Sequence, residues 1–218
     1  MSNNESFIDE VSEEVRRDKL YGYLRRYGWI AIAAVLLIVG AASWIEYRNT
    51  QARKQAQATG DALIAALNAE DPAVRASELQ AVEVAGPAIV VQALLAAATQ
   101  EEAGDIEAAR TTLDGVATNA DVSALYRDVA ALKSAMLPTE DTAAKLLALD
   151  QLAQPGRPFR LLALEQKAYV EVASGEIDAA IATLNSIAED AEVTRGLRER
   201  AQTMMVSLGE PLPVPDTQ

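Results

Sequence analysis

The chain has 218 residues, half of them hydrophobic, and a formal net charge of −13. It contains no cysteine and no histidine, which excludes the usual zinc sites, thiol redox motifs and nucleophile–histidine pairs. Glycine-rich phosphate-binding motifs are absent from the sequence, and the acidic balance would repel phosphate backbones and anionic lipids. We therefore expect no enzyme, no cofactor or metal, no nucleic-acid partner and no small-molecule substrate.

An uncharged run from Tyr27 to Ile45 predicts a membrane-spanning helix. As a helix it would cover roughly 28 Å, close to the thickness of a hydrocarbon core. Tyr27 and Trp29 at one end, and Trp44 and Tyr47 at the other, are typical of the two membrane interfaces. We therefore assign residues 27–47 to a single transmembrane helix.

A cleavable signal peptide is the main alternative, since Ala41-Ala42-Ser43 offers small residues at a possible cleavage site. However, a long segment, residues 1–26, precedes the run and is rich in acidic side chains, unlike a short basic leader. We therefore favour an uncleaved signal-anchor.

The basic residues near the span predict its orientation. Five lysines and arginines flank it on the N-terminal side and three on the C-terminal side: Arg16, Arg17, Lys19, Arg25 and Arg26 against Arg48, Arg53 and Lys54. By the positive-inside rule, residues 1–26 form a cytoplasmic stub and the rest faces outward. We expect a single-pass protein of the bacterial inner membrane with a periplasmic C-terminal domain.

The sequence after the span predicts an all-α domain. It is rich in alanine, leucine, glutamate and valine, which favours stacked helices. Residues 48–60 predict a helical stalk, residues 61–209 the domain, and residues 210–218 a flexible proline-rich tail. Predicted helix ends fall about 14 to 18 residues apart, at Asp71-Pro72, Gly86-Pro87, Gly104, Pro138, Pro155–Pro158, Gly175 and Gly209.

An internal repeat is the strongest motif. Residues 103–117 recur as residues 174–188 with seven of fifteen positions identical, and a degenerate copy at 140–153 lies between them. We predict that Gly104 or Gly175 ends the first helix of a hairpin and that the next, acidic residue caps the second. The alanine pairs 108–109 and 179–180 would let the two helices approach closely. Ala97 and Ala168 would face them from the first helices, while Leu113, Leu184, Val116 and Ile187 would fill the seam.

By this Gly-acidic-hydrophobic-acidic-x-Ala-x-x-x-Leu pattern, the chain resembles the tetratricopeptide-repeat superfamily over roughly residues 90–189. The resemblance implies a helical-hairpin solenoid after the single transmembrane helix. Taken with Ser6-Phe-Ile-Asp-Glu-Val, Tyr27-Gly-Trp-Ile, one span and an alanine-rich repeat domain, the chain resembles the YfgM-like family. That resemblance implies an ancillary subunit of the Sec translocon that links exported proteins to periplasmic chaperones.

The function expected from this resemblance is a membrane-anchored scaffold for protein–protein interaction. The alternative is a structural subunit or assembly factor of another inner-membrane complex. Projecting the superfamily's groove positions onto the chain gives a partner groove of Glu101, Tyr126, Lys133, Glu165 and Tyr169. Equally, both tyrosines could fill the core between hairpins. Adjacent acidic residues at 101–102, 140–141 and 189–190 are expected to be solvated helix ends.

Overall fold

The computed structural model describes residues 3–210, and the side chains of residues 25–30 and 32–210. Helices are the regular elements throughout this part of the chain, as the composition predicts. The chain divides between Ala58 and Thr59 into two compact units. The predicted tail from Pro211 onward and the side chains of the predicted stub up to Leu24 lie outside the described residues.

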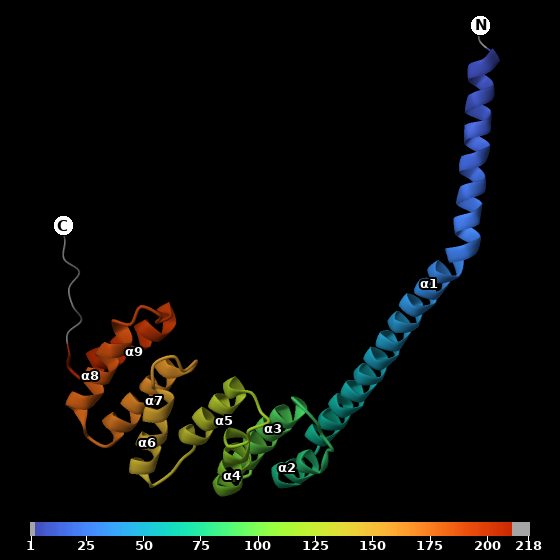
Figure 1. Cartoon of the computed structure of the whole chain (residues 1–218). Helices are drawn as coiled ribbons and strands as arrows, with labels where there is room; N and C mark the ends of the chain where they lie inside the picture. Colours follow the sequence, from blue (N-terminus) through green and yellow to red (C-terminus); the bar gives the residue numbers. More distant parts are fainter. Residues whose placement is uncertain (1–2, 211–218) are drawn as a thin grey trace, which may run out of the picture. The chain divides into compact units, whose positions relative to one another are not determined.

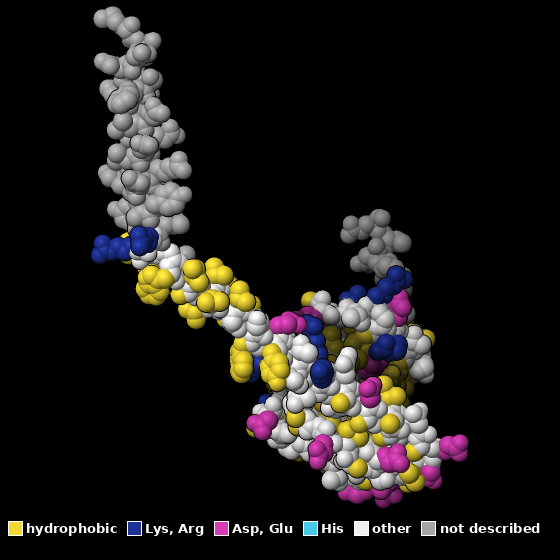
Figure 2. Space-filling model, turned by 90° about the vertical axis from the view of Figure 1, so that its right-hand side faces the viewer, with side chains coloured by type: hydrophobic (Ala, Val, Ile, Leu, Met, Phe, Trp, Pro, Cys, Tyr) yellow, Lys and Arg dark blue, Asp and Glu magenta, His cyan; other side chains and the backbone are white. Residues whose placement is uncertain are grey.

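The first unit consists of most of helix α1 (Asn3–Leu67), which carries the apolar run (Figure 1). The stretch Arg25–Leu67 is, in the described part of the chain, the one helix long and apolar enough to cross a membrane by length and composition. Its most apolar window is unburied, and Figure 2 shows hydrophobic side chains exposed along it. Residues 48–60 are helical, and α1 continues through Gly60 to its end at Leu67.

The end of α1 and the helices after it form the second unit, which we call the repeat domain. From α2 onward each helix packs against the next one in the chain (Figure 1). The helices are α2 (Pro72–Ala81), α3 (Ala88–Glu102), α4 (Ile106–Ala117), α5 (Ala124–Met136), α6 (Thr142–Leu152), α7 (Arg160–Ala173), α8 (Ile177–Ala188) and α9 (Arg195–Ser207). We call α3, α5 and α7 the first helices and α4, α6 and α8 the second helices of three hairpins; Figure 1 shows them along opposite sides of the array.

The glycine signals of the repeat end the first helices as expected. Gly104 and Gly175 have φ angles of 80° and 79°, the left-handed region that disfavours residues with a Cβ. The N–H groups after them close the same turn, since Asp105 donates to the Gln100 carbonyl at 2.8 Å and Glu176 to the Glu171 carbonyl at 2.9 Å. This turn fixes the direction in which each second helix starts.

The acidic cap is confirmed for Asp105, and the structure adds Asp141 of the middle hairpin, for which no cap was predicted. Asp105 accepts a hydrogen bond from the N–H of Ala108 at 3.0 Å, and Asp141 accepts one from Ala144 at 2.9 Å. The prediction is wrong for Glu176, whose side chain makes no capping bond. Aspartate is favoured over glutamate at this position because its shorter side chain reaches the free backbone donors.

The helix seams depend on one alanine of each pair. Ala109 and Ala180 are fully buried, and Ala97 and Ala168 of the first helices are buried as predicted. The preceding alanines are not part of the closest contact, because Ala108 is half-buried and Ala179 is exposed. Buried leucines, valines and isoleucines one and two turns further along fill the rest of the seams: Leu113, Val116, Leu149, Leu152, Leu184 and Ile187.

A second feature recurs in the first and last hairpins. The Thr112 hydroxyl donates to the Gln100 side chain at 2.9 Å, and the Thr183 hydroxyl donates to the buried Glu171 carboxylate at 2.8 Å. Each bond joins the first helix of a hairpin to the second. A buried polar group is thereby satisfied inside the seam, which avoids its desolvation cost.

Two turns were not predicted from the sequence. Residues 118–123 and 189–194 contain neither glycine nor proline, yet they end α4 and α8. Val122 is buried in one of them, and Thr194 in the other accepts a hydrogen bond from the N–H of Leu197 at 3.4 Å. Helices α2 to α9 are 10 to 15 residues long, so only the longest of them, α3 and α7, reach the predicted segment length.

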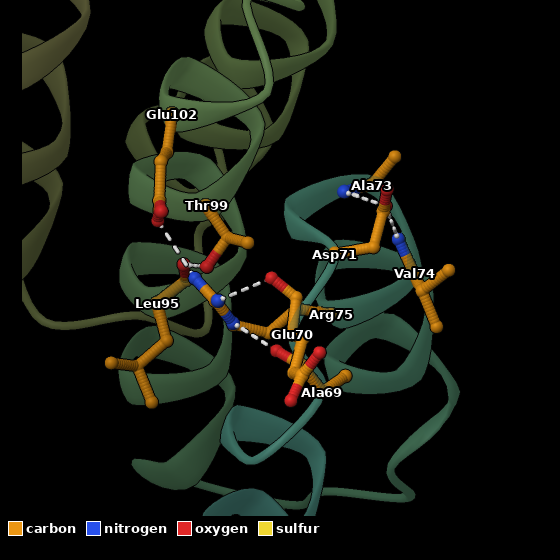
Figure 3. A network of polar contacts seen from close by, with 9 residues as sticks. All are labelled: Ala69, Glu70, Asp71, Ala73, Val74, Arg75, Leu95, Thr99 and Glu102. Atoms are coloured by element: carbon orange, nitrogen blue, oxygen red, sulfur yellow. Dashed lines mark hydrogen bonds and ion pairs between the residues drawn. The ribbon is translucent and has the colours of Figure 1, made fainter.

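Arg75 of α2 ties the start of the repeat domain together (Figure 3). Its guanidinium donates to the carbonyls of Ala69 and Glu70 in the turn after α1, at 2.9 and 3.2 Å. It also pairs with Glu102 at the end of α3 at 2.7 Å. Asp71, at the predicted Asp-Pro helix start, caps α2 through Ala73 and Val74 (Figure 3). One side chain therefore bridges three consecutive elements.

We predict that Ala180→Trp destabilises the repeat domain by about 1–3 kcal/mol, because an indole ring cannot enter a seam built for a methyl group. Ala179→Trp is the matched control, since the neighbouring alanine is exposed and should tolerate the ring. Denaturant unfolding of the full chain in detergent, followed by circular dichroism, measures both. Equal unfolding midpoints for the two variants would contradict the assigned helix contact.

Candidate functional site

Exposed hydrophobic side chains of the repeat domain gather on the first helices. Six large ones are exposed there: Val91 on α3, Leu125, Tyr126 and Met136 on α5, and Leu162 and Tyr169 on α7. Among the described residues of the second helices α4, α6 and α8, only Leu147 is of this kind. We call the exposed side of α3, α5 and α7 the first-helix surface. Exposed apolar groups concentrated on one side of a fold mark a surface that can bind another protein.

The two tyrosines predicted for the groove lie on this surface. Tyr126 is 45% exposed and Tyr169 is 39% exposed. The alternative that both rings fill the core between hairpins is therefore wrong, because core side chains of this domain are nearly inaccessible. A partly exposed tyrosine offers an apolar ring and a polar hydroxyl to a partner at low entropic cost.

Glu101 and Lys133, which lie on different helices, are brought together by the structure. Both line a small pocket of about 140 Å³ between α3 and α5, Glu101 as an exposed residue. Ala97, Leu113 and Leu137 supply buried parts of its wall. This pocket combines an apolar wall with one charge of each sign at its edge.

Glu165, the remaining predicted groove residue, is only 5% exposed. Its carboxylate accepts two hydrogen bonds from the Arg200 guanidinium of α9, at 2.6 and 2.8 Å, and a third from the Tyr169 hydroxyl at 3.1 Å. The two-pronged geometry fits a guanidinium against a carboxylate. Glu165 therefore holds α7 and α9 together and positions the Tyr169 hydroxyl.

The same network affects two pKa values. Hydrogen bonding to Glu165 raises the pKa of Arg200 above its ordinary value. Burial, followed by the nearby Glu165 charge, raises the pKa of the Tyr169 hydroxyl. Tyr169 therefore stays neutral at physiological pH and keeps its role as a hydrogen-bond donor.

A larger pocket at the start of α7 was missed by the sequence analysis. It measures about 520 Å³ and has an apolar side formed by Phe159, Leu161, Leu162 and Leu197. Arg157, Arg160 and Arg200 stand around it, and each is paired with an acidic residue. The available signal was Phe159, one of only two phenylalanines, placed directly after the Pro155–Pro158 turn.

Acidic pairs of the sequence lie at helix ends, as predicted. Glu101 and Glu102 end α3, Asp141 caps α6, and Glu189 follows α8. Asp190 accepts a hydrogen bond from the N–H of Glu192 at 2.9 Å and pairs with Arg160 at 2.8 Å. These two contacts, in that order, lower the pKa of Asp190. The acidic pairs therefore serve to close turns at helix ends.

The predicted interface aromatics of α1 are all exposed: Tyr27, Trp29, Trp44 and Tyr47. The Trp44 and Tyr47 rings lie 6.3 Å apart between centroids, and the Arg26 guanidinium lies 6.0 Å from the centre of the Tyr27 ring. Aromatic side chains at both ends of an apolar helix, with basic residues at one end, are typical of helices whose ends lie at the two membrane–water interfaces.

Comparison with known protein families identifies the class. A tetratricopeptide repeat-like domain family matches residues 22–204. Because the match covers most of the chain, the protein belongs to this family, and its helical hairpins are repeats of that kind. No curated protein and no solved structure matches the chain. Domains of this type generally act as non-catalytic scaffolds, which indicates a role in protein–protein interaction.

We predict that Arg200→Gln lowers the melting temperature of the chain by a few degrees, since Glu165 would lose the partner that compensates its burial. Arg195→Gln is the matched control on the same helix. The ion pair of Arg195 with Glu199 is exposed, so its loss should leave the melting temperature nearly unchanged. Circular dichroism melts of both variants test this prediction. Equal melting temperatures for the two variants would contradict the role of Glu165 in holding α7 and α9 together.

Proposed function

We propose that this protein is a membrane-anchored scaffold that presents the first-helix surface of its repeat domain to other proteins. The observation that carries the proposal is the concentration of exposed hydrophobic side chains on α3, α5 and α7, next to second helices that are almost free of them. Family membership supports the class of function, because stacked helical hairpins form extended binding surfaces.

The apolar part of α1 supplies the anchor in this proposal. It is exposed, long enough to span a hydrocarbon core and bounded by aromatic side chains at both ends. The basic residues before the span outnumber those after it, so the repeat domain would face the periplasm of a bacterial cell.

The partner that we propose is the Sec translocon of the inner membrane, with the repeat domain linking exported proteins to periplasmic chaperones. The support is the resemblance to the YfgM-like family in the order of acidic stub, single span and alanine-rich repeat domain. A chain emerging from a translocon exposes hydrophobic segments, and a surface that carries Leu125, Tyr126, Leu162 and Tyr169 is suited to bind them.

The topology predicts that protease added to spheroplasts removes the repeat domain and leaves a fragment that contains residues 1–26, protected by the membrane. An epitope tag at each end of the chain, followed by immunoblotting, distinguishes the two parts. A cytoplasmic protein serves as the control for intact membranes. Protection of the repeat domain, with cleavage of a known periplasmic protein in the same sample, would refute the orientation.

The binding surface predicts that Tyr126→Ala combined with Tyr169→Ala reduces recovery of partners at least about tenfold while changing the melting temperature little, because both rings are partly exposed and neither belongs to the buried core. The measurement is mass spectrometry of proteins that co-purify with the full chain from gently solubilised membranes. Leu147→Ala is the control, since Leu147 is an exposed hydrophobic residue of a second helix.

Translocon subunits should be recovered with the wild-type chain and with Leu147→Ala. Recovery of another stoichiometric complex would favour a structural or assembly subunit of that complex instead. Full recovery with the double tyrosine variant would show that partners bind elsewhere.

A further inference from the structure

The middle hairpin departs from the other two at one position. Each second helix starts after an acidic residue, and the residue four positions later donates its backbone N–H to the carbonyl of that acidic residue. This residue is Ala109 in α4 and Ala180 in α8, both fully buried, but it is Lys145 in α6. A lysine side chain cannot enter a seam built for a methyl group, so the contact between α5 and α6 opens beside it.

A pocket of about 380 Å³ lies at this place, between α4, α5 and α6. Its volume is at the small end of the range for ligand pockets, about 300–1,000 Å³. Its wall contains four alanine methyl groups, from Ala131, Ala135, Ala144 and Ala148. Its polar groups are Arg110 and Asp114 of α4, Ser134 of α5, Thr139 and Asp141 of the following turn, and Lys145.

The two basic side chains converge on the end of α5. The Arg110 guanidinium donates to the carbonyls of Ser134 and Pro138 at 3.2 and 2.9 Å. The Lys145 ammonium donates to the carbonyl of Leu137 at 3.4 Å. These bonds satisfy carbonyls at a helix end that lacks a glycine cap. A guanidinium has five N–H donors and an ammonium three, so both groups keep donors for a further acceptor.

No carboxylate of the described residues pairs with either cation, whereas most other basic side chains of the repeat domain have acidic partners: Arg75, Arg157, Arg160, Lys167, Arg195 and Arg200. The two carboxylates of the pocket are engaged otherwise. Asp114 accepts a hydrogen bond from the Ser134 hydroxyl at 2.7 Å, and Asp141 caps the N–H of Ala144 at 2.9 Å. Arg110 and Lys145 therefore share one pocket without forming an ion pair with a carboxylate of the described residues.

The pKa of Lys145 reflects its closeness to Arg110. Burial, followed by repulsion from Arg110, lowers the pKa of Lys145 below its ordinary value. The folded state therefore favours the neutral amine more than the unfolded chain does, and stability rises as pH increases from the folded pKa to the unfolded pKa. An anion placed between the two cations would relieve their repulsion and reverse this shift.

We propose that this pocket binds a carboxylate on a short aliphatic stem, with the carboxylate between Arg110 and Lys145 and the methylene groups against the alanines. The chemistry is that of a glutamate side chain of a partner protein or of a free aliphatic dicarboxylate. The site lies between α4, α5 and α6 and includes none of the exposed hydrophobic residues of the first-helix surface. The proposed function therefore does not depend on it.

Nuclear magnetic resonance of the full chain in detergent, with ¹³C at the lysine ε carbons, tests the proposal. The chain has five lysines, Lys19, Lys54, Lys133, Lys145 and Lys167, so the spectrum is simple. Glutarate is titrated against chloride at constant ionic strength. The Lys145 resonance should shift saturably and its pKa should rise, while Lys133 and Lys167 stay unchanged. An equal response of all lysines, or none, would overturn the proposal.

Variants locate the site through saturation transfer from the protein to the glutarate methylene groups. Arg110→Gln and Lys145→Ala should each weaken glutarate binding at least about tenfold, because each removes a charge-assisted hydrogen bond. Lys133→Gln, which removes a lysine outside the pocket, should bind like the wild type.

If Arg110→Gln fails to fold, Lys145→Ala still tests the site, because this variant is expected to fold. Alanine already occupies this position in α4 and α8, so the variant should melt at or above the wild-type temperature. Undiminished saturation transfer in folded Lys145→Ala would overturn the proposal. A second titration with acetyl-Gly-Glu-Gly-amide identifies the source, since tighter binding than glutarate assigns the site to a partner's glutamate and weaker binding to a free dicarboxylate.

Discussion

The closeness with which a second helix can approach its first helix governs the rest of the repeat domain. The acidic residue after the turn fixes where the second helix begins, and the fourth residue after it faces the first helix. A methyl group there, at Ala109 and Ala180, lets the buried leucines at the next turn, Leu113 and Leu184, reach the seam. A single hairpin has too little apolar surface to be stable by itself, so this contact also sets how neighbouring hairpins stack.

The middle hairpin shows the effect of relaxing this constraint. Lys145 replaces the alanine, and the connection from the end of α5 to the cap Asp141 is longer than the connection from α3 to Asp105. The seam still closes further along, because Leu149 and Leu152 are buried in a cluster with residues of α5 and α7. Polar contacts of Arg110 and Lys145 with the carbonyls at the end of α5 offset the wider start.

Charge and apolar surface are distributed differently over the protein. Most basic side chains of the repeat domain pair with acidic groups of the same domain, as Arg75 does with Glu102 and Arg200 with Glu165. Exposed hydrophobic groups are confined mainly to the first helices and to the apolar part of α1. The net charge of −13 disfavours self-association, while the exposed apolar side chains form two separate regions of the chain.

Features that depend on local backbone geometry could be predicted from the sequence alone. An uninterrupted apolar run specified the exposed helix, glycines specified the left-handed turns at 104 and 175, and the internal repeat specified the seam alanines 109 and 180. Such features are set by helical periodicity and by steric limits on φ, which act over a few residues.

Which distant side chains meet became evident only in the packed domain. Glu165 is a plausible groove residue by position, yet it is buried against Arg200 of another helix. Lys145 and Arg110 come from different helices, and nothing in the sequence around either one indicates the other. The turns at 118–123 and 189–194 likewise depend on packing of the helices that they join. The physical reason is that helix crossing geometry, fixed by the whole seam, determines which of these groups come into contact.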